Sequence, residues 1–205
     1  MISPRSLPRP RSPLHEPDGA RDWYERRLGW ATSEGPPLEL LTGLRFDVLE
    51  LPADAGLATL RRVPRTGPVV LHGTRMRLLV AAGSAGELPA LLDWLEWGGV
   101  ALDLTAVGTG GRTAAPLAHG PGDRPVWLRP PAPGREVEPA LPAMTVRGGT
   151  TAGGADGTAP DLVRLVGAAA TECHRARLLR ADAQPFAFSY ASRTVAGTRP
   201  RSLTS

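Results

Sequence analysis

The sequence predicts a mixed α+β domain. Short apolar runs of strand length alternate along the chain with segments in which apolar residues recur every three to four positions, as on one face of a helix. Two of the apolar runs are separated by only a few turn-forming residues, which predicts a hairpin. An apolar fraction of 41% is sufficient for a core.

Proline and glycine divide the chain into parts. They number 22 and 24 among 205 residues and are frequent near the N-terminus and after residue 130. We therefore predict one folded domain with disordered ends. The parts are a Pro/Arg-rich tail over 1–18, the domain over 19–131, a Pro/Gly-rich linker over 132–159, a helix over 160–181 and a basic tail over 182–205.

The domain is expected to begin with a short helix over residues 19–29, for which Asp18 is a plausible N-cap. The pair Pro36-Pro37 then favours loop, or at most one helical turn, up to residue 43. Four of the seven residues 45–51 are apolar, and the segment predicts a buried strand.

A helix over residues 53–62 should follow that strand. Leu57, Leu60 and Val63 recur near one face, and Asp54 lies at the end where a helix dipole favours negative charge.

The predicted hairpin consists of residues 68–71 and 76–81. After it, Ser84 and Glu87 have the spacing of a capping box at the start of a helix. Four leucines follow at helical spacing, and Trp94 and Trp97 are expected to pack beside them. These leucines are Leu88, Leu91, Leu92 and Leu95.

Residues 100–107 predict the next strand, with residues 113–115 pairing to it across a glycine loop and 126–128 forming a last short strand. The helix near the C-terminus should run over 161–181. Cys173 lies on its apolar face and is expected in the core.

Charge is unevenly distributed along the chain. The net charge is +4, of which residues 1–18 contribute +1, residues 19–173 contribute −2 and residues 174–205 contribute +5. A domain that grips polynucleotides usually has a basic core, because neutralising phosphates supplies most of the non-specific affinity. The basic C-terminal segment is therefore a candidate site for a protein partner.

The single cysteine cannot form an internal disulfide, and the four histidines have no metal-ligand spacing. The N-terminus lacks the apolar stretch of a signal peptide. No run of about 18 apolar residues occurs, so we expect no membrane partner. These features predict a cytoplasmic protein.

Three segments carry a resemblance to a known family. They are residues 46–50 (FDVLE), residues 73–78 (GTRMRL) and residues 102–104 (LDL), the last leading into Gly110-Gly111 and Ala115-Pro116. In order and context they resemble the N-terminal bifunctional DNA primase/polymerase domain of the archaeo-eukaryotic primase superfamily. The resemblance covers about residues 19–130. It implies a primase/polymerase-like sheet related to the RNA-recognition (RRM) fold, with flanking helices.

The resemblance also implies a site. The family's sheet carries a D-x-[DE] carboxylate pair, a histidine and a third carboxylate, which bind two divalent metals and the incoming nucleotide. Two metals suit in-line phosphoryl transfer, because charge develops on both the entering and the leaving oxygen. The implied catalytic and metal-binding residues are Asp47, Glu50 and Asp103, with Mg²⁺ or Mn²⁺, and the implied nucleotide-binding residues are Arg75, Gly110, Gly111 and Arg112.

The chain departs from this pattern in two motifs. Either Asp47 or Glu50 can be the first carboxylate, but then Leu49 or Pro52 replaces the second. Asp47 and Glu50 cannot form the pair together, since residues three apart on a strand face opposite sides unless a bulge intervenes. Met76 takes the histidine position, and a thioether cannot make the charged or strong hydrogen-bonding contact that a histidine makes.

Three functions remain open. The first is a primase/polymerase-like module in which nucleotidyl transfer is weakened or lost and which binds nucleotides or DNA or regulates replication. The second is an active metal-dependent DNA primase/polymerase. The third is a non-enzymatic factor that binds a protein partner through the C-terminal segment around residues 186–201.

Overall fold

The computed structural model describes residues 17–117, 124–132, 136–144 and 161–182. Most of the predicted tails and linker lies outside these ranges. Within them the protein is a mixed α+β structure, as the sequence predicts, and its sheets are antiparallel. No helix of the described segments is long and apolar enough to cross a membrane.

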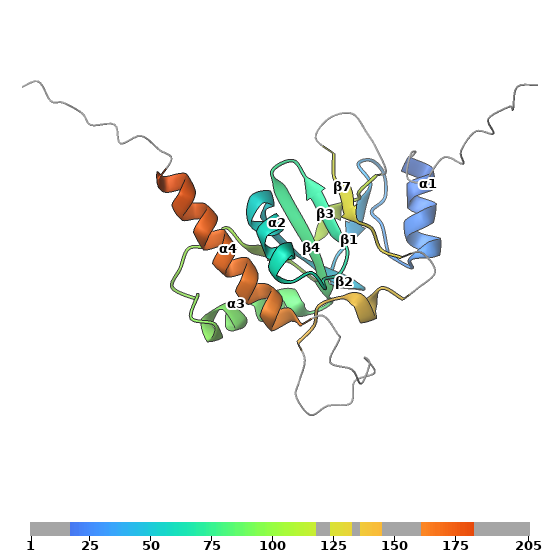
Figure 1. The fold of residues 1–205 in the computed structure, drawn as a ribbon. Helices are drawn as coiled ribbons and strands as arrows, with labels where there is room; N and C mark the ends of the chain where they lie inside the picture. The colour runs from blue at the N-terminus through green and yellow to red at the C-terminus, as the bar shows by residue number, and fades with distance from the viewer. Residues whose placement is uncertain (1–16, 118–123, 133–135, 145–160, 183–205) are drawn as a thin grey trace, which may run out of the picture.

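The helices and strands follow one another along the chain in a mixed order (Figure 1). The helical elements are α1 (Pro17–Asp22), the π-helical turn η2 (Trp23–Arg27), α2 (Ala53–Arg62), α3 (Ser84–Trp94), the 3-10 turn η3 (Glu138–Ala140) and α4 (Leu162–Asp182). The strands are β1 (Glu39–Leu41), β2 (Phe46–Pro52), β3 (Val69–His72), β4 (Arg75–Ala81), β5 (Thr105–Val107), β6 (Arg112–Ala114) and β7 (Val126–Arg129).

Five strands form the central sheet in the order β5-β2-β4-β3-β7, and all neighbours are antiparallel. The predicted hairpin is confirmed as β3 and β4, joined at the His72↔Arg75 pair. A separate ribbon consists of β1 and β6. Helices α2, α3 and α4 cover one face of the sheet, and α1 lies on the other side (Figure 1).

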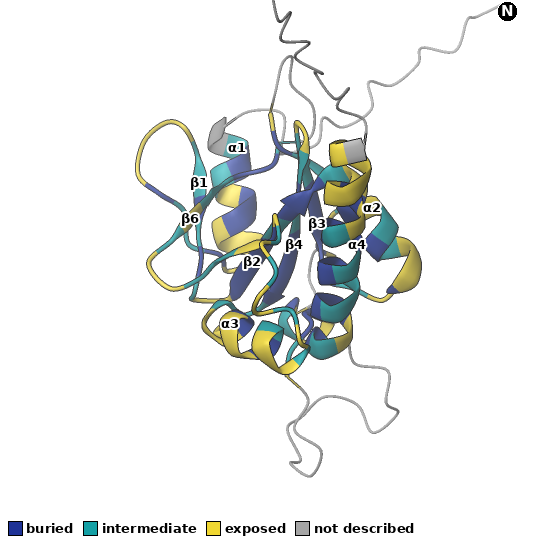
Figure 2. Cartoon of the chain, turned by 90° about the vertical axis from the view of Figure 1, so that its left-hand side faces the viewer, coloured by how far each residue is buried: buried dark blue, intermediate teal, exposed yellow. Residues whose placement is uncertain are grey.

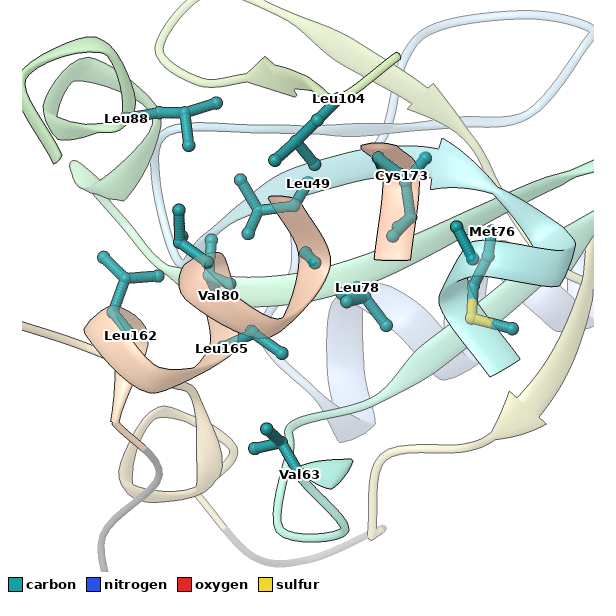
Figure 3. Close-up of a cluster of buried hydrophobic side chains, with 14 of the residues drawn as sticks. Leu49, Val63, Met76, Leu78, Val80, Leu88, Leu104, Leu162, Leu165 and Cys173 are labelled. Atoms are coloured by element: carbon teal, nitrogen blue, oxygen red, sulfur yellow. The ribbon is translucent and has the colours of Figure 1, made fainter. Parts of the chain in front are cut away.

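Strand β2 lies between β5 and β4 and is buried on both faces, since six of its seven residues are buried and Glu50 is intermediate. Leu49 and Leu51 point to the core under α2, α3 and α4, where they meet Leu78 and Val80 of β4 (Figure 3). Helix α4 supplies Leu162, Leu165, Val166, Ala169 and Cys173 to this same core. The predicted burial of Cys173 is confirmed.

On the opposite face, Phe46 and Val48 of β2 pack with aromatic residues from the N-terminal segment. Trp30 lies 4.5 Å from Phe46 and 6.3 Å from Trp127, measured between ring centroids. Trp127 Nε1 donates to the Tyr24 hydroxyl at 3.0 Å. Figure 2 shows the buried strands between the two covering layers.

Helix α2 has the predicted bounds, and Leu60 and Val63 of the predicted face contact the core, but the rest of the buried face differs. Leu57 is exposed, whereas Ala55, Gly56 and Thr59 are buried. The reason is close packing on the sheet, because a Cβ atom at Gly56 would lie 2.9 Å from Met76 Cβ. Only small residues fit between the helix and β4.

The predicted capping box of α3 is wrong. The N-cap residue is Gly83, no side chain of the cap bonds to the helix, and Ser84 is the first helical residue. The acceptor comes from β2 instead, since Asp47 Oδ2 accepts a hydrogen bond from Ala85 N at 2.8 Å. The predicted packing of Trp94 is also wrong, because its side chain is exposed.

The predicted strand over 100–107 is confined to β5, and the predicted pairing of residues 113–115 with it is wrong. Strand β6 pairs with β1, a strand in a segment predicted as loop. Two hydrogen bonds from Thr42 hold the glycine loop before β6 beside β1. Its N–H donates to Gly111 O, and its Oγ1 donates to Gly108 O.

Candidate functional site

The three segments of the resemblance lie on adjacent strands of the central sheet. Strand β2 contains residues 46–50, β4 contains most of residues 73–78, and β5 follows residues 102–104. Because β2 lies between β5 and β4, segments distant in sequence meet at one place on the sheet. Glu50, Arg75 and Arg77 alternate with core residues and lie on the sheet face away from α2, α3 and α4. With Asp103, which lies just before β5, they form a charged cluster.

Glu50 is the centre of this charged cluster. Its Oε1 accepts from Arg75 Nε at 3.1 Å, and its Oε2 accepts from Arg77 Nε at 2.7 Å. Arg77 is the residue directly opposite Glu50 on β4. Arg75 Nη1 extends the cluster to Asp103 Oδ1 at 2.7 Å. One guanidinium therefore joins the two carboxylates.

The pKa values follow from these contacts. Burial acts to raise the pKa of Glu50, but the hydrogen bonds and charges of Arg77 and Arg75 outweigh it and hold the pKa below its ordinary value. Burial acts to lower the pKa of Arg75, and its bonds to Asp103 and Glu50 raise it instead. Both groups are therefore charged at neutral pH.

Asp103 is held in place by α4. Cys173 Sγ lies 3.5 Å from Asp103 O, and Arg177 Nη1 donates to Ala101 O at 2.5 Å. Burial raises the pKa of the Cys173 thiol to about 12, and the charge of Asp103 acts in the same direction. A cavity of about 580 Å³ lies in front of Asp103 and Arg75. It is also lined by Pro52, Ala53, Asp54, Gly73, Thr74 and Arg180.

The structure does not bring Asp47 to this cluster. Asp47 is 1% exposed and lies on the opposite face of the sheet, where it caps α3. Its side chain contributes to helix stability there, because a carboxylate accepts a free N–H of the first turn and complements the helix dipole. Gly108 leaves room for it, since a Cβ at that position would lie 3.3 Å from Asp47 Oδ2.

Met76, at the position of the family's histidine, also faces away from the charged cluster. It is fully buried in the core between β4 and α2 (Figure 3). A histidine at this position on the strand would point into the helix-covered core, where Met76 has a packing role.

In the described ranges, the glycine loop before β6 has a structural role. Gly111 N donates to Gly108 O at 2.9 Å, and Gly110 has a φ of +77°, which favours glycine. Arg112 lies 3.9 Å from Glu39 on the neighbouring strand β1. Gly110, Gly111 and Arg112 do not line the cavity beside Arg75 and Asp103.

The charged cluster does not fit the two divalent metals that the resemblance implies. Asp47 lies on the far face, and the guanidinium of Arg75 lies between Glu50 and Asp103, where a shared cation would have to bind. Within the described ranges, no group of three or more His, Cys, Asp or Glu side chains could hold a metal ion. The cluster as arranged has two positive and two negative side chains.

Sequence reasoning missed two residues of this region. Arg77 alternates with Arg75 on β4, and a period of two places both on one face of a strand, so this signal was available. Arg180 carries no such signal. It reaches Asp54 from 126 residues away along the chain, with Nη2 at 2.9 Å from Oδ1.

Comparison of the chain with protein-family models, with curated proteins and with solved structures gave no match.

Proposed function

We propose that the protein is a cytoplasmic primase/polymerase-like domain that binds single-stranded DNA and does not transfer nucleotides. The proposal takes its family from the motifs of the sequence and its lack of transfer from the arrangement of the charged cluster.

The topology supports the first part. Elements β2-α2-β3-β4-α3-β5 follow the order βαββαβ, and their strands lie in the order β5-β2-β4-β3. This chain order is that of ferredoxin-like folds, and a four-stranded sheet of this kind is the framework of RNA-recognition domains. The two central strands, β2 and β4, carry the first two motifs.

One observation carries the second part, namely the position of Arg75 between Glu50 and Asp103. Metal-assisted phosphoryl transfer needs carboxylates that are free to bind cations on the entering and leaving oxygens. Here both carboxylates accept hydrogen bonds from arginine, and charge-assisted bonds of this kind are strong. The arginine thus takes over the neutralising role of a metal without its Lewis acidity.

The experiment combines binding and turnover. Purified protein is titrated into fluorescein-labelled oligo(dT), and the same preparation is incubated with a primer–template, deoxynucleoside triphosphates and Mn²⁺. We expect salt-dependent binding without extension of the primer, in wild type and in Asp103→Asn alike. Extension by wild type that Asp103→Asn abolishes would establish an active polymerase instead. Absence of binding to DNA would leave the alternative of a protein-binding factor.

A further inference from the structure

An arginine-lined groove runs between α2 and α4, and two of its residues, Asp54 and Arg180, also line the cavity in front of Arg75 and Asp103. Its volume is about 550 Å³. Small residues keep it open, among them Ala55, Ala58 and Ala176, and Leu179 adds exposed apolar surface at its edge. Four arginines line it, two from each helix: Arg61, Arg62, Arg175 and Arg180.

Two acidic side chains lie in the groove, and both are already paired. Glu172 is 4% exposed, and its Oε1 lies 2.6 Å from Arg62 Nε and 3.3 Å from Arg175 Nη1. Asp54 accepts from Arg180 Nη2 and from the backbone N–H of Ala55. Four arginines against two carboxylates leave the groove with a net charge of +2.

The arginines retain free donors. A guanidinium has five N–H groups in a planar fork, and the pairs with Glu172 and Asp54 use only one nitrogen of each arginine. Arg61 is exposed and has no carboxylate partner among the residues that the structure describes. Arginine forks bind phosphate oxygens with good geometry, and a half-exposed guanidinium loses little hydration on doing so.

The groove is also long enough for more than one phosphate. Asp54 and Arg62 are eight residues apart on α2, which corresponds to about 12 Å of helix. Glu172 and Arg180 are eight residues apart on α4, so arginines lie at both ends of this length. Successive phosphates of one strand are about 3.4 Å apart along the axis of a duplex.

We infer that this groove is the surface on which the protein binds the phosphodiester backbone of single-stranded DNA. The charged cluster is a poorer site for a polyanion, because its two arginines are matched by two carboxylates. The inference rests on the proposed function, since it names the binding surface for the same ligand.

The test compares two double variants of equal charge in the full chain. Arg61→Gln/Arg175→Gln removes two groove arginines and leaves Glu172 paired with Arg62. Arg27→Gln/Arg164→Gln removes two exposed arginines that do not line the groove, one of them on α4 itself. Binding of labelled oligo(dT) is measured by anisotropy over a range of salt, with thermal unfolding as the check on folding.

We expect the groove variant to bind roughly tenfold more weakly or worse, and the slope of log K against log salt to fall by about 1.4, which corresponds to two lost phosphate contacts. The control variant should resemble wild type. An excess of tripolyphosphate should compete less well than unlabelled oligo(dT), which separates a nucleic-acid backbone from a free polyphosphate.

Three results would overturn the inference, and they bear differently on the proposed function. Equal weakening in the two double variants would mean a diffuse charge effect, and the proposed function would stand. Loss of binding only in a variant that ends at Ala183 would place binding in the C-terminal segment. If wild type fails to bind oligo(dT) at all, both the inference and the DNA-binding part of the proposed function are wrong.

Discussion

Arg75 and Asp103 lie 28 residues apart in sequence, yet Arg75 Nη1 is 2.7 Å from Asp103 Oδ1. The same guanidinium bonds to Glu50, so two carboxylates of the charged cluster are joined by an arginine. This contact distinguishes a charge-compensated sheet from a metal-binding one, because the carboxylates bind arginine in place of a metal cation.

Glu50→Gln should lower the free energy of unfolding by about 1–3 kcal/mol at neutral pH, because Arg75 and Arg77 lose their charged acceptor in a partly buried place. The pKa of Glu50 is held below its ordinary value of 4.5, so its contribution is complete above that pH and is lost as the pH falls through the lowered pKa. The difference from wild type, measured by urea unfolding at several pH values, should therefore shrink in acid.

Glu34→Gln is the matched control, because Glu34 is exposed and has no ion pair within the described ranges. Its effect should stay within about 0.5 kcal/mol at every pH. A Glu50→Gln protein that is as stable as this control would show that the charged cluster does not form.

Asp47→Ala should cost about 0.5–2 kcal/mol of stability, as the loss of a helix cap does. Asp47→Asn keeps an acceptor for Ala85 N–H and should cost less. Amide hydrogen exchange in the first turn of α3 should accelerate in the alanine variant. Equal rates of amide hydrogen exchange in the alanine and asparagine variants would argue against capping of α3 by Asp47.

Gly56→Ala should destabilise the fold by about 1–3 kcal/mol through overpacking. The added Cβ would lie 2.9 Å from Met76 Cβ, between α2 and β4. Gly86→Ala is the control, because nothing lies within 4 Å of a Cβ there and alanine favours a helix. Thermal melts should therefore shift in opposite directions for the two variants.

Cys173 should resist thiol reagents in the native protein. Its side chain is 2% exposed, and the raised pKa of about 12 leaves almost no thiolate at pH 8. Labelling with a disulfide reagent should be slow in buffer and fast in guanidinium chloride. Rapid native labelling would mean that α4 is not packed over Asp103.

The elements that could be predicted from sequence are those with a local signal. The strand β2 and the β3–β4 hairpin have apolar runs bounded by turns, and α2 has the predicted bounds. The ribbon of β1 and β6 could not be predicted, because its pairing of Glu39 with Ala114 joins distant segments. Neither segment alone has a sequence pattern that indicates the pairing. The buried face of α2 was predicted only in part, since Leu57 is exposed and the close approach of Met76 selects small residues over leucine.

The candidate site, too, could be predicted only where its residues have a local signal in the sequence. Glu50, Arg75 and Asp103 could be named from motifs, and alternation along β4 would also have given Arg77. The position of Asp47 on the far face follows from the alternation of β2, but its role as a cap depends on Ala85, which lies 38 residues further on. Such contacts depend on tertiary structure and have no short-range signature.

The most direct test of the central claim is an anisotropy titration of fluorescein-labelled oligo(dT) with wild type and Asp103→Asn, each with Mn²⁺ and with a chelator. If the arginine-bridged carboxylates do not bind metal and the protein still binds DNA, all four titrations will give saturable binding of similar affinity. Binding by wild type that requires Mn²⁺ and is lost in Asp103→Asn would contradict the account, because the carboxylates would then act through a metal.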